Sequence, residues 1–221
     1  MFEDKINQDV IDRVNILKKQ LTNKIIPDSY PDEISNWEYN KFVGYGDGLN
    51  RFDIVKLSSF PIISNDWLSS LAKWIGDRKC LEIMSGTGML SRGLSNFGID
   101  IIATDNYSWV SEHTNWFNEN STWYPVENTD CIDAIEKYGR DVDIVICSWA
   151  YMDDGLYKAL IKMREVNPNC QMIYIGEGDG GCTASDKFFE TLVEVDDNSF
   201  NNAVKNFRSW WGVYDRPMLI K

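Results

Sequence analysis

The clearest chemical signal in this sequence is a short glycine-containing turn with one acidic residue just before it and another at the end of the next apolar run. Glu82 lies within an apolar run that continues into a turn containing Gly86 and Gly88. Asp105 ends the next apolar run, 17 residues beyond Gly88. Small residues let the backbone turn tightly and approach a ligand, and an acid at the end of the following strand can accept both hydroxyl groups of a ribose. This spacing indicates a site for a nucleoside-containing cofactor.

The position of Glu82 restricts which cofactor fits. A dinucleotide-binding turn has the pattern G-x-G-x-x-G, but here its sixth position is Ser91. Glu82 precedes Gly86 by four residues, where its carboxylate would repel a pyrophosphate and attract an ammonium group. The pattern therefore favours a nucleoside that carries a cationic group, and a nicotinamide-dependent reductase stays open as a weaker alternative.

An alternation of strands and helices is expected to position these acids. The expected strands are residues 79–84, 99–105, 122–126, 141–149, 171–177 and 215–221, and the expected helices lie within residues 64–76, 88–97, 130–139, 153–166 and 183–192. Strands that are apolar on both faces and alternate with helices indicate a parallel sheet covered on both sides. We therefore predict an α/β, doubly wound, Rossmann-like fold, mostly parallel with an antiparallel terminal strand. Its ligands would lie beyond the carboxyl ends of the strands.

The first 59 residues are expected to form a helical extension to this domain. One apolar stripe at helical spacing consists of Ile6, Val10, Val14, Leu17 and Leu21. Residues 27–60 contain prolines and glycines without a sustained period, which predicts loops and short pieces. We expect residues 1–59 to pack over the site as a lid, and residues 60–221 to form the cofactor-binding domain.

Composition and charge exclude several classes of protein. The chain has 221 residues, of which 43% are hydrophobic and 25% charged, as in ordinary folded domains. Its net charge of −12 disfavours binding to bulk nucleic acid or to anionic membranes. No apolar run approaches the roughly 18 residues needed to span a membrane, and the N-terminus is too polar for a secretory signal. The five cysteines form no C-x-x-C pair, so we expect free thiols, no metal site and a cytoplasmic protein.

The glycine turn resembles that of class I S-adenosylmethionine-dependent methyltransferases. LEIMSGTG, residues 81–88, is similar to their E-x-G-x-G-x-G motif, with Met84 in place of the first glycine. The resemblance implies that the cofactor is S-adenosylmethionine. It implies that the methionine part is held by Glu82, Ser85, Gly86 and Gly88, and that the rest of the cofactor site includes Asp105 at the ribose, Asp130 at the adenine, Asn106 and Ser148.

A wider resemblance, over residues 60–221, is to a poorly characterised methyltransferase-like group with a GEGxGGCT segment, here residues 176–183. That group and the amino-methyltransferases carry a polar-Pro-Pro-aromatic run after the fourth strand. Here the run is Ser148-Trp149-Ala150-Tyr151-Met152, which contains no proline. An amine acceptor is therefore only one of the options.

The sequence predicts a methyltransferase that passes a methyl group from S-adenosylmethionine to a small-molecule or protein substrate. Asp153, Glu177 and Tyr151 are the candidate catalytic residues, and either acid could act as general base toward a hydroxyl or carbon acceptor. Two alternatives keep the cofactor. The chain could bind S-adenosylmethionine without transfer, as a regulator or partner subunit, or it could cleave the molecule.

Overall fold

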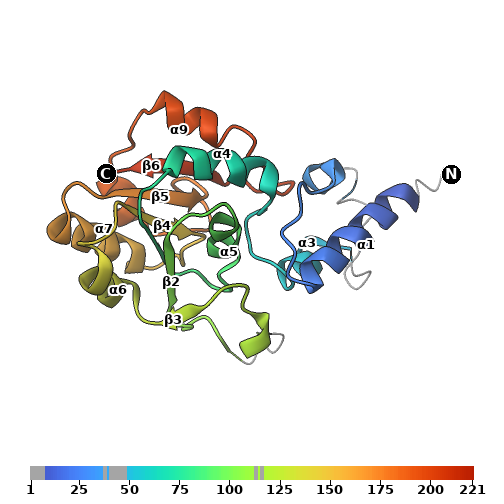
Figure 1. The fold of residues 1–221 in the computed structure, drawn as a ribbon, viewed down its shortest axis with the longest axis horizontal. Coiled ribbons are helices and arrows are strands. Elements are labelled where there is room, and N and C mark those ends of the chain that lie inside the picture. The colour runs from blue at the N-terminus through green and yellow to red at the C-terminus, as the bar shows by residue number, and fades with distance from the viewer. Residues whose placement is uncertain (1–7, 37–38, 40–48, 112–113, 115–116) are drawn as a thin grey trace.

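The expected alternation of strands and helices is present in the computed structural model, which describes residues 8–36, 39, 49–111, 114 and 117–221 (Figure 1). The strands are β1 (Cys80–Ile83), β2 (Ile101–Asp105), β3 (Val126–Asn128), β4 (Ile144–Ser148), β5 (Gln171–Gly176) and β6 (Arg216–Ile220). They form one sheet in the order β3-β2-β1-β4-β5-β6, parallel except for β6, which is antiparallel to β5. The predicted doubly wound, mostly parallel sheet with an antiparallel terminal strand is confirmed.

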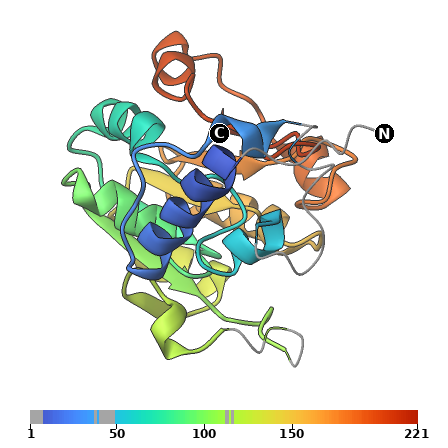
Figure 2. The same ribbon diagram turned by 90° about the vertical axis from the view of Figure 1, so that its right-hand side faces the viewer.

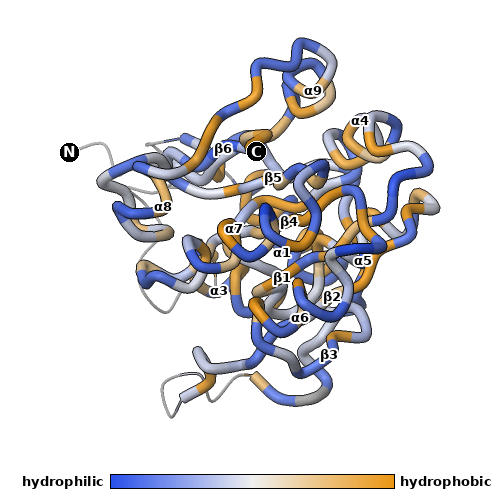
Figure 3. Tube along the Cα trace, turned by 90° about the vertical axis from the view of Figure 1, so that its left-hand side faces the viewer, coloured by the Kyte–Doolittle hydropathy of each residue, from blue (hydrophilic) through white to orange (hydrophobic). Residues whose placement is uncertain are grey.

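Helices cover both faces of this sheet because its strands are apolar on both sides. One face carries α4 (Asn65–Ile75), α5 (Met89–Asn96) and α9 (Asn198–Ala203), and the other carries α6 (Cys131–Tyr138), α7 (Gly155–Val166) and α8 (Asp186–Thr191). Along β4, Ile144 and Ile146 join the first hydrophobic cluster, whereas Val145 and Cys147 join the second. In Figure 3, the central strands accordingly include apolar segments of the tube, coloured orange.

Two elements differ from the sequence-based expectation. The strand expected over residues 122–126 begins only at Val126, where it pairs with Ala103 of β2. Pro125 has no N–H to donate to a sheet, and the N–H of Trp123 donates instead to the carbonyl of Thr87 at 2.7 Å. The other difference is α9, which the sequence analysis did not assign; Asp197 caps this helix and Phe200 anchors it in the core.

The described part of the N-terminal segment packs into the core of the sheet domain. It forms α1 (Gln8–Thr22), the short 3-10 helix η1 (Asp32–Ser35) and α3 (Arg51–Val55); a second 3-10 helix, η3 (Glu119–Ser121), precedes β3. Val14, Leu17 and Leu21 of α1 are buried and belong to the hydrophobic cluster that also contains α4. Figure 1 shows α1 and α3 at the same end of the molecule, and Figure 2 shows this end face on, with α1 in blue and α3 in cyan.

No helix among the described residues has the length and apolar character that crossing a membrane requires. Four of the cysteines, Cys80, Cys131, Cys147 and Cys170, are buried free thiols, and Cys182 is an exposed one. The described residues also contain no cluster of three His, Cys, Asp or Glu side chains arranged to hold a metal ion.

Adjacent residues of α1 test whether the N-terminal segment unfolds together with the core. Leu17 is 2% exposed and Ile16 is 60% exposed. We expect Leu17→Ala to lower the free energy of unfolding by about 2–4 kcal/mol, because it leaves a cavity in the shared cluster. Ile16→Ala, the matched control, should change it by less than about 0.5 kcal/mol. Urea unfolding followed by circular dichroism measures both, and equal effects would contradict the packing described.

Candidate functional site

A cavity of about 660 Å³ opens at the carboxyl ends of β1, β2 and β4, where the chain order reverses within the sheet. Its wall contains most of the site residues predicted from the sequence: Glu82, Ser85, Gly86, Asp105, Asn106, Asp130, Ser148, Tyr151 and Asp153. Gly88 and Glu177 are not among the described lining residues. Strand ends thus bring together residues that are up to 71 positions apart, from Glu82 to Asp153.

Glu82 is a buried carboxyl group at the inner end of the cavity. Its neighbours in β1 point toward α6 and α7, so Glu82 itself faces α5. It is 1% exposed, and its Oε2 accepts hydrogen bonds from the backbone N–H of Ser91, at 3.1 Å, and from the Ser91 hydroxyl. Burial raises the pKa of Glu82 to about 8, despite these two hydrogen bonds. No cationic side chain among the described residues pairs with this carboxyl group, so none of them holds it ionised at neutral pH.

The turn after β1 uses three left-handed residues, and one of them is not glycine. Met84, at the position of the first motif glycine, has a φ of 52°, a conformation that costs a non-glycine residue about 1–2 kcal/mol. A Cβ on Gly86 would meet nothing within 4 Å, so this residue leaves open space beside the cavity. A Cβ on Gly88 would lie 2.9 Å from Val126, so Gly88 is needed for close packing against β3.

Asp105 ends β2 and organises the loops on both sides of the cavity. Its Oδ2 accepts from the N–H of Gly86 at 2.7 Å, while its Oδ1 accepts from the N–H of Tyr107 at 2.6 Å and from the indole of Trp109 at 3.1 Å. Burial raises the pKa of Asp105, and these hydrogen bonds oppose that rise. Asp105 thus fixes the glycine turn relative to the loop after β2.

Asn106 and Asp130 form a second polar group on the same side. The amide nitrogen Nδ2 of Asn106 donates to Oδ2 of Asp130 at 3.0 Å. The other oxygen of Asp130 accepts from the N–H of Ile132 at 2.9 Å, so Asp130 is also the N-cap of α6. Both side chains line the cavity, Asn106 just beyond the end of β2 and Asp130 just beyond the end of β3.

Two buried hydroxyl groups in the cavity wall have no hydrogen-bond partner within the described part of the chain. They are Oγ of Ser85, after β1, and Oγ of Ser148, at the end of β4. A buried polar atom without a partner is costly to the fold and usually indicates a ligand or water contact. The two hydroxyls therefore indicate that a polar group belongs between the ends of these strands.

The loop after β4 is held by contacts that the sequence analysis did not identify. Trp149 has a φ of 55°, its N–H donates to the carbonyl of Ile175 at 2.8 Å, and its indole donates to Oδ2 of Asp215 at 2.9 Å. Its ring stacks on Phe60, with ring centroids 5.2 Å apart and planes 14° from parallel. Because Asp215 precedes an antiparallel strand, it lies at the same sheet edge as the ends of the parallel strands. The expected antiparallel direction of the last strand could therefore have placed Asp215 near the site from the sequence alone.

The three candidate catalytic residues differ in where they lie. Tyr151 and Asp153 line the cavity, and Oδ1 of Asp153 accepts from the N–H of Gly155 at 2.8 Å where α7 begins. Glu177 instead accepts from the N–H groups of Cys182, at 2.8 Å, and Tyr214, at 3.2 Å. Burial alone would raise the pKa of Glu177, but these hydrogen bonds outweigh burial and lower it. In this structure Glu177 holds together two loops.

The outer wall of the cavity comes from the N-terminal segment. The wall contains Phe52 and Val55 of α3, Lys56 at the C-terminal end of that helix, and residues 58–61. The hydroxyl of Thr87 donates to the carbonyl of Ser58 at 2.9 Å, which ties this stretch to the glycine turn. Sequence periodicity could not show this placement, because these residues carry no regular pattern.

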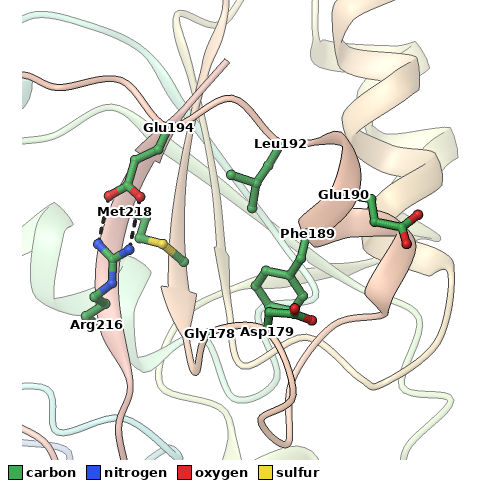
Figure 4. Close-up of a pocket in the computed structure, with 8 residues that line it drawn as sticks. All are labelled: Gly178, Asp179, Phe189, Glu190, Leu192, Glu194, Arg216 and Met218. Atoms are coloured by element: carbon green, nitrogen blue, oxygen red, sulfur yellow. Dashed lines mark hydrogen bonds and ion pairs between the residues drawn. The ribbon is translucent and has the colours of Figure 1, made fainter.

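A smaller hollow of about 270 Å³ lies between α8 and β6, with Gly178 and Asp179 at one end (Figure 4). Arg216 is the only cation among its described lining residues, and its guanidinium forms two hydrogen bonds with Glu194, at 2.7 and 3.0 Å. This positive charge is therefore already neutralised within the protein, and the larger cavity is the stronger candidate site.

No protein-family profile matches the sequence, and no curated protein matches it. Solved structures of similar fold include TehB from Haemophilus influenzae, with 16% identity over 78% of this chain and 67% of that chain and a TM-score of 0.44. A SAM-dependent methyltransferase from Archaeoglobus fulgidus has 15% identity over 70% of this chain and 92% of that chain, with a TM-score of 0.41. Magnesium protoporphyrin IX methyltransferase from Synechocystis PCC 6803 has 11% identity over 95% of this chain and 97% of that chain, with a TM-score of 0.44. Similarities at this level do not identify a function, so the function is derived from the cavity.

The raised pKa of Glu82 predicts how stability depends on pH. The carboxyl group of Glu82 binds its proton more tightly in the folded protein than in the unfolded chain. Its contribution to the free energy of unfolding is therefore complete below about pH 4.5 and is lost as the pH rises through about 8. Between these values we expect wild type to lose about 1.4 kcal/mol per pH unit relative to Glu82→Gln. Urea unfolding at pH 5, 7 and 9 measures the difference. The same comparison with Glu190→Gln, an acid outside the cavity, is the control. Parallel pH profiles for wild type and Glu82→Gln would contradict this description.

Proposed function

We propose that this chain is an S-adenosylmethionine-dependent methyltransferase that binds its cofactor along the carboxyl ends of β1, β2 and β4. The observation that carries the proposal is a buried carboxyl group, Glu82, in one cavity with two buried hydroxyls, Ser85 and Ser148, that have no partner. A ligand with an ammonium group and a carboxylate on one carbon would satisfy all three. The amino-acid end of S-adenosylmethionine has both groups.

The remaining cavity residues support a nucleoside next to this amino-acid end. Asp105 is a buried carboxylate that is already oriented by backbone N–H groups, so it would accept the ribose hydroxyls without reorganisation. Asn106 and Asp130 lie farther along the same wall, where the amide of Asn106 donates to the carboxylate of Asp130. We assign them to the adenine side, Gly86 to close backbone contact, and Gly88 to the packing that shapes the turn.

When bound, S-adenosylmethionine would supply a methyl group on cationic sulfur. The acceptor's lone pair would form the new bond to carbon, and the S–CH₃ electron pair would stay on sulfur, which becomes a neutral thioether. Any proton lost by the acceptor would pass to a base or to water. The protein's task is mainly to align the acceptor and exclude water. Asp153 is the best placed base, because it lines the cavity and its Oδ2 bonds to no described residue. Tyr151 lies beside it, and Glu177 acts indirectly by holding the loop.

The acceptor is proposed to be a small molecule or a protein side chain and not bulk nucleic acid. The net charge of −12 opposes a phosphate backbone. The cavity itself is lined by four acids, Glu82, Asp105, Asp130 and Asp153, against a single described cation, Lys56. The outer wall is formed by Phe52, Val55, Lys56 and residues 58–61, and this placement supports a lid role for the N-terminal segment.

Calorimetric titration with S-adenosylmethionine tests the cofactor assignment. We expect Asp105→Asn to weaken binding at least about tenfold, because charge-assisted hydrogen bonds to the ribose are lost. Ser148→Ala should weaken it less, and Glu190→Gln, outside the cavity, should leave it unchanged. Circular dichroism confirms that each variant is folded. Equal affinity of wild type and Asp105→Asn would contradict the proposed orientation.

Proton release upon binding is a second, independent signature. At pH 6.5 the carboxyl group of Glu82 is protonated, and a bound ammonium group would lower its pKa and expel the proton. We expect wild type to release about one proton per bound S-adenosylmethionine, and Glu82→Gln to release none. Titrations in buffers with different ionisation enthalpies measure the number. Identical proton release by both proteins would assign the proton to another group.

A further inference from the structure

Exposed apolar side chains gather around the outer part of the cavity. Eleven large hydrophobic residues are exposed among the described residues, and four of them line this cavity: Phe52 at 42%, Phe60 at 49%, Tyr151 at 65% and Met152 at 63%. They come from two distant segments of the chain. Exposed apolar groups that converge on one cavity indicate an apolar occupant. None of the residues assigned above to the cofactor belongs to this group.

A rigid aromatic wall lies next to these side chains. Trp149 is fixed by its backbone bond to Ile175, by its indole bond to Asp215 and by stacking on Phe60. Its left-handed backbone conformation persists because these contacts over-determine it. A rigid flat wall favours a flat ligand, since stacking requires little loss of side-chain freedom.

Two charged side chains of the cavity wall lie outside the part assigned to the cofactor, namely Lys56 and Asp153. Lys56 is exposed, is the only cation among the described lining residues, and forms no ion pair with a described residue. In contrast, the acids Glu82, Asp105 and Asp130 lie at the strand ends assigned to the cofactor. Asp153 accepts from the N–H of Gly155 and is the proposed base toward the acceptor, so Lys56 is the charged group left to bind an anion. An ammonium group without an ion-pair partner among the described residues, in the same cavity as an apolar wall, is complementary to an anionic group on an apolar ligand.

We propose that the methyl acceptor is a small, flat, largely apolar molecule that carries an anionic group, with its body against Trp149 and Phe60 and its anion at Lys56. This inference rests on the proposed function, because it places the acceptor in the part of the cavity that the cofactor leaves. It narrows the substrate from small molecules and proteins in general to aromatic or similarly flat anions.

Three probes of equal shape test the proposal: 1-naphthoate, 1-naphthamide and 1-naphthylmethylammonium, each titrated into the full chain by calorimetry. We expect naphthoate to bind about tenfold more tightly than naphthamide, and the ammonium probe most weakly. Lys56→Gln should remove the preference for naphthoate and leave naphthamide binding unchanged. Phe60→Ser should weaken both probes. The matched control Lys73→Gln changes an exposed lysine of α4 outside the cavity and should change nothing.

A separate titration of wild type with S-adenosylmethionine distinguishes the two levels of the argument. If S-adenosylmethionine binds but naphthoate binds no better than the other probes, the acceptor class is overturned and the proposed function stands. If naphthoate is preferred and S-adenosylmethionine does not bind, the proposed function is overturned, while the preference for a flat anion is supported. A naphthoate preference that survives Lys56→Gln would overturn the role of Lys56.

Discussion

The site depends on one constraint: a carboxyl group is buried in the sheet interior, where an apolar side chain would pack at no cost. Glu82 lies on a largely apolar face of the sheet, and Ser91 is the only hydrogen-bond partner of its carboxyl group among the described residues. Its charged form is therefore unfavourable until a cation arrives. A residue that weakens the ligand-free fold in this way is better explained by what it binds than by stability. Binding of a cation beside it would in turn stabilise the unit formed by β1 and α5.

Around this carboxyl group, the loops after β1, β2 and β4 share a left-handed backbone conformation at a residue that is not glycine. Met84 follows β1, Tyr107 follows β2 and Trp149 follows β4, and each has a φ between 52° and 55° although none is glycine. Asp105 accepts from the N–H of Gly86 in the loop after β1 and from the N–H of Tyr107 in the loop after β2, and Asp215 accepts from the indole of Trp149. Each of these loops is therefore held by a buried acid. Sharp turns of this kind bring side chains and backbone back over the sheet edge instead of away from it. The cavity is thus shaped by strained but well-supported loops.

Much of this arrangement could be predicted from the sequence, because strand ends are visible as the ends of apolar runs. That logic placed Glu82 and Asp105 in the wall of one cavity. It could not place Lys56 or Phe60, which lie in a segment without periodicity whose path is set by tertiary contacts, such as the hydrogen bond from Trp210 to the carbonyl of Phe60. The strand before Val126 was also misplaced, since local β-propensity in that stretch is overridden by packing on the glycine turn.

The indole bond between Trp149 and Asp215 also makes the aromatic wall depend on the terminal strand of the sheet. The two residues are 66 positions apart, and Asp215 directly precedes β6, which pairs with β5. The position of the Trp149 ring is therefore coupled to the antiparallel edge of the sheet as well as to the loop that carries it. A chain in which β6 has come away from β5 would keep its five parallel strands, yet its Trp149 indole would lose the acid that orients it.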